Sequence, residues 1–381
     1  MDFRLSEVQI GLAETLSRFV AAEYGEAKRA GYLAHNVGYD LACWQRLTEL
    51  GLAALGVSEE SGGLGGTLAD LMVAIQALGP GLLLDPWLPT FITGRLLEKL
   101  GSTAQKETWL ERLITGQCVL GFAHTEPGGW QQLSHCTVRA IPGDGYTING
   151  AKLLALGAGA DALLVSARTS DHAQDEKGIS LFLVQPDARG LTQRSYRLAD
   201  ASVAMTLDCR DLSLNRASLV GPEGEAFEAI EEVIAEACIL LSSEAIGIMD
   251  AAMVATVKHL QIRKQFKVPL GSFQAIQHRM ADCAAELELA RSITIRAAIL
   301  HSDGVASREE RLSAAFGAKA FTASAARKIA EETVQFHGAI GITQELWVGR
   351  AMKRLLVIAG LFGDERVLTQ RYNALRISGG R

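Results

Sequence analysis

Residues 259–278 read HLQIRKQFKVPLGSFQAIQH and join the end of one long helical pattern to the start of another. A Pro-Leu-Gly break at 269–271 follows Arg263, Gln265 and Phe266. These three residue types suit a diphosphate-linked cofactor, because a guanidinium binds phosphate oxygens bidentately and an aromatic ring offers a flat apolar face. An ordinary helix end, with a cation opposing the helix dipole and a buried phenylalanine, fits the same residues.

Long helical patterns lie on both sides of this stretch. Residues 223–261 lack proline, and their Ala/Ile/Leu pattern predicts one long helix. Further helical patterns follow over 273–302, 308–338 and 350–377. The C-terminal part is therefore predicted to be a helical bundle.

The periodicity changes in the middle of the chain. Short runs rich in Val, Leu and Ile are separated there by Gly, Pro and Asp turns. The runs cover residues 118–124, 136–141, 146–149, 162–167, 179–185 and 205–214. They predict an antiparallel β domain.

The first 117 residues read as helices, and Ser6 with Gln9 predicts a capping box at the start of the first one. The order of patterns predicts an α+β fold, mostly α, in three parts. These parts are an N-terminal helical domain at 1–117, a β-barrel domain at 118–220 and a C-terminal four-helix bundle at 221–381.

The composition of the chain argues against several classes of function. The net charge is −6 and there is no basic tract, which argues against nucleic-acid binding. We expect no membrane span, because no long uncharged apolar run is present, and no signal peptide, because the N-terminus is acidic and amphipathic. Six cysteines without a CxxC pair predict reduced thiols, a cytoplasmic location and no metal site.

Four motifs carry a family resemblance. They are HTEPGG (124–129), GDGYTINGAK (143–152), RKQFKVPLGSFQAIQH (263–278) and QFHGAIGIT (335–343). In this order and spacing the chain resembles the acyl-CoA dehydrogenase family over essentially its whole length. The resemblance implies bound FAD, an acyl-CoA substrate oxidised between Cα and Cβ, a glutamate base, and electron-transfer flavoprotein as the acceptor.

The resemblance also implies that FAD lies across a subunit interface. One subunit would hold the flavin ring, and its neighbour would hold the diphosphate and adenine. The residues that match the diphosphate half are Arg263, Gln265, Phe266, Gln335, Gly338 and Gly341. The residues expected along the flavin edge are Phe122, His124 and Thr125.

Four positions depart from the family pattern. Leu154 stands where the family has a tryptophan that stacks on the flavin, and Leu156 stands where a threonine bonds flavin N5. The usual catalytic glutamate falls on Phe362, and the alternative glutamate position on the long helix falls on Ala237. None of these side chains can accept a proton.

We therefore expect a non-catalytic chain of an α2β2 acyl-CoA dehydrogenase that is paired with a homologous catalytic subunit. It resembles the small subunits of steroid side-chain or pimeloyl-CoA dehydrogenases, in lipid metabolism and β-oxidation. A relocated base at Glu244 or Asp364 would instead make it a self-sufficient homo-oligomeric enzyme. A third hypothesis is a flavin-free scaffold subunit. The acyl group is not set by the sequence, and a bulky polycyclic one is expected from the resemblance alone.

Overall fold

The computed structural model describes residues 5–129, 132–170, 172–302, 304–343 and 345–378. The chain forms two compact units, each with its own core. Unit 1 contains residues 1–26, 68–83 and 238–381, and unit 2 contains residues 27–67 and 84–237. The predicted division into three domains at residues 117 and 220 stays a prediction, since the two units group residues by contact and not by sequence order.

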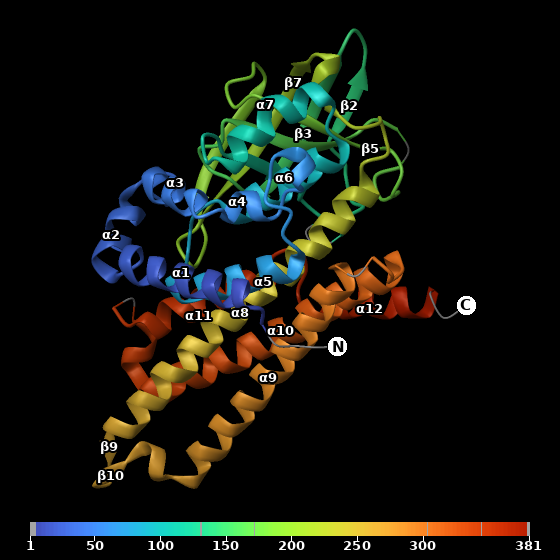
Figure 1. Cartoon of the computed structure of the whole chain (residues 1–381). Coiled ribbons are helices and arrows are strands. Elements are labelled where there is room, and N and C mark those ends of the chain that lie inside the picture. Colours follow the sequence, from blue (N-terminus) through green and yellow to red (C-terminus); the bar gives the residue numbers. More distant parts are fainter. Residues whose placement is uncertain (1–4, 130–131, 171, 303, 344, 379–381) are drawn as a thin grey trace. The chain divides into compact units, whose positions relative to one another are not determined.

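Unit 1 is helical (Figure 1). Its helices are α1 (Glu7–Glu23), α5 (Leu68–Leu78), α8 (Phe227–Ile262, counted here from Cys238), α9 (Gln274–Ser302), α10 (Arg308–His337), α11 (Trp347–Gly360) and α12 (Glu365–Ser378). Short 3₁₀ turns lie at η2 (Gly79–Gly81), η4 (Leu270–Ser272) and η5 (Gly338–Ile342), and a small hairpin is formed by β9 (Lys264–Gln265) and β10 (Val268–Pro269).

Capping boxes fix the start of two of these helices. The Gln9 backbone N–H donates to Ser6 Oγ at 3.2 Å, and the Ser6 N–H donates to Gln9 Oε1 at 2.9 Å. The predicted box at α1 is therefore confirmed. Ser307 and Glu310 form the same arrangement at α10.

The long predicted helix is confirmed as α8, which has 36 residues. Glycines let it pack closely against its neighbours in unit 1, because a Cβ on Gly247 would lie 2.1 Å from the Gln76 carbonyl oxygen. A Cβ on Gly79 would likewise lie 2.8 Å from the Glu244 carbonyl oxygen. Among the described residues, α8 alone is long and apolar enough to cross a membrane, but 83% of its most apolar window is buried inside the structure, as in a core helix.

The helical pattern over 350–377 forms two helices instead of one. α11 ends at Gly360 and α12 begins at Glu365. Between them Phe362 and Gly363 have φ of 60° and 127°. These left-handed conformations cannot continue an α-helix, so the chain turns sharply at the position expected for a catalytic glutamate.

Unit 2 combines short helices with an eight-stranded sheet. The helices are α2 (Glu26–Ala34), α3 (Leu41–Glu49), α4 (Leu52–Leu55), η1 (Glu59–Ser61), α6 (Trp87–Leu100), α7 (Thr103–Ile114) and η3 (Arg216–Ser218). The strands are β1 (Leu120–Ala123), β2 (Arg139–Pro142), β3 (Tyr146–Ala155), β4 (Ala162–Arg168), β5 (Ile179–Val184), β6 (Leu191–Arg197), β7 (Val203–Leu214) and β8 (Leu219–Val220).

The sheet differs from the predicted antiparallel domain in two ways. The strand order is β6-β7-β3-β2-β4-β5-β8, with β1 paired to β4, and both β1 and β2 run parallel to β4. β6 was not predicted, because its residues are mostly exposed and polar. A bridge between Phe122 and Leu156 also links β1 to the end of β3, so β3, β2, β4 and β1 form a closed ring.

The six cysteines agree with the predicted reduced thiols. All six are free and buried. Burial raises the pKa of the Cys238 thiol to about 11, which keeps it protonated and unreactive at neutral pH.

Candidate functional site

The connection between α8 and α9 is a tight hairpin in unit 1. Its two-residue loop, Phe266 and Lys267, has φ of 52° and 69°, as a type I′ turn requires. This turn leaves the Phe266 side chain 87% exposed. The buried phenylalanine of the ordinary helix-end interpretation is therefore wrong.

Arg263 and Gln265 lie at the base of this hairpin with exposed side chains. The Arg263 backbone is held on both sides, because its N–H donates to His259 O and its carbonyl accepts from Leu270 N–H, each at 2.8 Å. Neither the Arg263 nor the Gln265 side chain forms a hydrogen bond or ion pair with any residue that the structure describes. Both side chains are thus available to an external polar ligand.

The end of α10 supplies the other matching residues. Gln335 is exposed, and Gly338 ends the helix with φ 68° and ψ −149°, a conformation that favours glycine. Gly341 is buried in η5, where a Cβ would lie 2.6 Å from the Val334 carbonyl oxygen. Glycine is therefore required there for the turn to fold back on its own helix.

A pair of stacked histidines brings these two helix ends together. The His259 ring of α8 lies 4.4 Å from the His337 ring of α10, with 28° between the planes. His259 is one turn before Arg263, and His337 is two residues after Gln335. The structure therefore places the Arg263 and Gln335 segments next to each other, through a contact that sequence reasoning did not identify.

The expected flavin edge lies in unit 2, and its side chains point mainly inward. Phe122 is 2% exposed and its ring stacks on that of His124. His124 is also buried, and its ring nitrogens face Ser166 Oγ at 2.9 Å and the Leu133 carbonyl at 2.8 Å. The rings of Phe122 and His124 thus pack in the protein interior, and their contact with a flavin stays a prediction. Thr125 is half-buried.

Beneath this segment lies a buried ion pair. Lys152 Nζ is 2.6 Å from Glu126 Oε1, and both side chains are 0% exposed. Glu126 also accepts from the N–H and hydroxyl of Thr137, each at 2.5 Å, and Lys152 donates to Ser166 Oγ at 2.9 Å. Burial would raise the pKa of Glu126, but the Lys152 ammonium and the Thr137 hydrogen bonds lower it to about 2. This network holds the segment after β1 against β3.

The two leucines that replace polar family positions lie at the end of β3. Leu154 and Leu156 are half-buried. Leu154 has φ 49°, within an irregularity of the β3–β7 pairing, and its N–H donates to the Tyr196 hydroxyl at 3.2 Å. Neither leucine side chain can donate a hydrogen bond to a flavin.

The carboxylates proposed as relocated bases are engaged in structural contacts. Glu244 binds Arg354 bidentately in unit 1, with Arg354 Nε 2.6 Å from Oε1 and Nη2 2.9 Å from Oε2. Asp364 caps α12, because its Oδ1 accepts from the Val367 N–H at 2.9 Å. An ion-paired carboxylate is a weak proton acceptor, so the structure does not support Glu244 as the base.

The neighbouring positions on α8 offer no replacement. Ala237 is fully buried and has no proton acceptor. Glu236 pairs with Arg95 of α6, whose Nε is 3.0 Å from Oε2, and only 12% of the Glu236 side chain is exposed.

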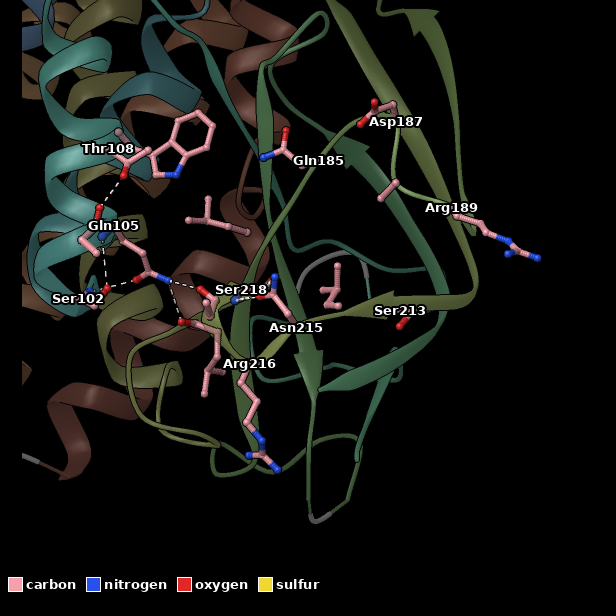
Figure 2. Close-up of a pocket in the computed structure, with 17 residues that line it drawn as sticks. Ser102, Gln105, Thr108, Gln185, Asp187, Arg189, Ser213, Asn215, Arg216 and Ser218 are labelled. Atoms are coloured by element: carbon pink, nitrogen blue, oxygen red, sulfur yellow. Dashed lines mark hydrogen bonds between the residues drawn. The ribbon is translucent and has the colours of Figure 1, made fainter. Parts of the chain in front are cut away.

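A separate hollow of about 790 Å³ lies in unit 2 between α7 and the turns after β5 and β7 (Figure 2). It contains none of the predicted site residues. Gln105 bonds the Ala217 and Leu219 carbonyls, each at 2.9 Å, and the Arg189 side chain points away from the hollow. The Gln105 amide is therefore used within the fold, and the Arg189 guanidinium does not face the hollow.

Models of three protein domains from one family match most of the chain. Residues 6–117 match the acyl-CoA dehydrogenase N-terminal domain, residues 121–215 the middle domain, and residues 224–374 the C-terminal domain.

Individual relatives agree. A probable acyl-CoA dehydrogenase of Bacillus subtilis, YngJ, is 29% identical over 93% of each chain. Acyl-CoA dehydrogenase FadE12 of Mycobacterium tuberculosis is 30% identical over 81% of each. The solved Tcur3481–Tcur3483 steroid ACAD, in a G363A variant, superposes with a TM-score of 0.87 at 26% identity, covering 98% of this chain and 99% of that one. The predicted fold, with helical N-terminal, β middle and helical C-terminal parts, is confirmed.

Proposed function

Because this chain belongs to the acyl-CoA dehydrogenase family, we propose that it supplies the diphosphate-binding half of an FAD site to a homologous catalytic subunit. The chain is an acyl-CoA dehydrogenase, an oxidoreductase acting on a CH–CH bond. The finer proposal concerns how it takes part in that reaction, as the non-catalytic chain of an α2β2 assembly.

The proposal rests on the exposed Arg263 side chain, which has no partner among the residues that the structure describes. Such a guanidinium fits an anionic group, and the exposed Phe266 ring can pack against a flat ring of the ligand. Gln335 adds a donor and an acceptor at the adjacent helix end. These residues fit the diphosphate and adenine of FAD, which supplies the redox chemistry of the family when bound.

The residues at the positions expected to hold the flavin ring do not fit that ring. Leu154 and Leu156 have no polar side-chain atom, and Phe362 cannot take the substrate α-proton. With Glu244 paired to Arg354, the self-sufficient alternative loses its leading candidate base. We therefore propose that the partner chain binds the flavin ring and supplies the catalytic base.

Solved relatives support pairing of unlike chains. The Tcur3481–Tcur3483 steroid ACAD joins two named proteins, and so does the ChsE4–ChsE5 complex of Mycobacterium tuberculosis, which at 22% identity compares in fold alone. From the first of these we propose a bulky polycyclic acyl-CoA as substrate. A solved chain from work on the electron transferring flavoprotein of Acidaminococcus fermentans is 26% identical, and we propose such a flavoprotein as the electron acceptor. We also propose a cytoplasmic location.

The test is flavin retention by the co-purified complex. Arg263→Ala is expected to weaken FAD binding by on the order of 1.5–3 kcal/mol, about tenfold to a hundredfold, since a charge-assisted contact is lost. Lys264→Ala, at the adjacent exposed cation, is the matched control and should leave binding unchanged. Equal FAD content after dialysis of wild type and Arg263→Ala would contradict the assigned role.

A further inference from the structure

The stacked pair formed by His259 and His337 joins the two helix ends of the half-site, and its rings also have groups that can take up a proton. Each ring sits at the C-terminal end of a long helix, one turn before Arg263 in α8 and immediately before Gly338 in α10. We propose that this histidine pair is a proton-linked part of the diphosphate site, which takes up a proton when the anionic ligand binds. The inference rests on the proposed function and adds regulation of the same site by pH.

The hydrogen bonds leave ring nitrogens open to a ligand. His337 Nδ1 lies 2.8 Å from the Thr333 carbonyl oxygen, so Nδ1 carries a hydrogen and Nε2 remains open. His259 makes no side-chain hydrogen bond with any residue in the described part of the chain. Both rings are half-buried, so they combine partial access to solvent with a fixed position.

The surroundings of His259 disfavour its protonation when no anion is bound. Burial, His337 and Arg263 all lower the pKa of His259. Arg279 of α9 lies over the ring of Phe336, the residue before His337, and pairs with Glu332 of α10 at 2.6 Å, so these two charges largely cancel.

A diphosphate reverses this balance. Two protonated imidazoles beside Arg263 repel one another, whereas negative oxygens among them would stabilise each added proton. Protonation of the pair is then more favourable in the complex than in the free protein. By linkage, FAD affinity rises as the pH falls, by at most about tenfold per pH unit for one proton taken up.

The test uses the full chain as it purifies with its partner, stripped of flavin and titrated with FAD from about pH 6 to pH 8.5. Wild type is expected to bind more tightly at lower pH, with proton uptake detected by calorimetry in buffers of different ionisation enthalpy. His337→Gln and His259→Phe should each flatten the pH dependence and reduce proton uptake. ADP should show the wild-type slope and adenosine should not, if the diphosphate is the linked group.

A matched control exists on α9. His301 Nδ1 lies 2.9 Å from the Ala297 carbonyl, the same local contact as His337 makes, but at the end of the helix remote from the hairpin. His301→Gln should keep the wild-type slope. An unchanged slope in both His259→Phe and His337→Gln, with their folding confirmed by circular dichroism, would overturn the inference. Arg263→Ala separates the two proposals, because undiminished FAD binding by that variant counts against the half-site itself.

Discussion

The buried Glu244–Arg354 pair gives the sharpest prediction, because it separates a structural carboxylate from a catalytic one. Only 3% of the Glu244 side chain and 7% of the Arg354 side chain are exposed, and two hydrogen bonds of 2.6 and 2.9 Å join them. Removing one partner from such a pair leaves a buried charge without compensation, which costs about 3–5 kcal/mol.

Glu244→Gln is therefore expected to lower the melting temperature of the transition that reports on unit 1. A loss of about 3–5 kcal/mol corresponds to roughly 6–20 °C, at about 2–4 °C per kcal/mol for domains of 150–250 residues. Differential scanning calorimetry and urea denaturation measure this change. Exchange of the substrate α-proton in the complex, measured below the new transition, should stay at the wild-type rate.

A double variant checks the reasoning. Glu244→Leu combined with Arg354→Met replaces both charges by apolar groups of similar size, so it should recover most of the stability lost in Glu244→Gln. The structural role would be refuted if Glu244→Gln kept its stability and stopped proton exchange. That result would restore Glu244 as the base of a self-sufficient enzyme.

Three further predictions concern other contacts. The pKa of Glu126 is lowered from 4.5 to about 2, so its stabilising contribution is full above pH 4.5 and is lost as the pH falls towards 2. Glu126→Gln should therefore lower the free energy of unfolding by on the order of 3 kcal/mol at pH 7, and this free energy should fall less steeply with acid in chemical denaturation. The same fall with acid as in the wild type would contradict the pairing of Glu126 with Lys152. Gly341→Ala places a Cβ 2.6 Å from the Val334 carbonyl and should destabilise unit 1 by about 1–3 kcal/mol in thermal melting, whereas neutrality would show that η5 can move. Asp364→Ala removes the α12 cap and should cost about 1 kcal/mol without slowing proton exchange; slower exchange at unchanged stability would identify Asp364 as a base.

The parts of the fold that the sequence predicted well depend on local signals. The Ser6–Gln9 capping box and the proline-free run of α8 are each visible within a few turns of chain. β6 was missed because an exposed, polar strand lacks the apolar alternation that identifies strands. The parallel pairing of β1 with β4 was missed because it joins distant segments, and no local pattern encodes it.

In the candidate site too, the residues of a local motif were predicted from the sequence and the contacts between distant residues were not. Arg263, Gln265 and Phe266 were predicted from one short motif, and the hairpin explains their exposure. The contacts that decide the alternatives are all non-local. Glu244 and Arg354 are 110 residues apart, and only the packed helices bring them together. The same holds for His259 and His337, whose stacking depends on where α8 and α10 end.

We propose that this chain supplies half of an FAD site and none of the reacting groups. The most direct measurement is FAD content and acyl-CoA turnover of the chain purified alone and co-purified with a homologous chain that carries the missing glutamate, tryptophan and threonine. We expect little FAD and no turnover for the lone chain, and both FAD and turnover for the complex. Full FAD occupancy with turnover by the lone chain would contradict it.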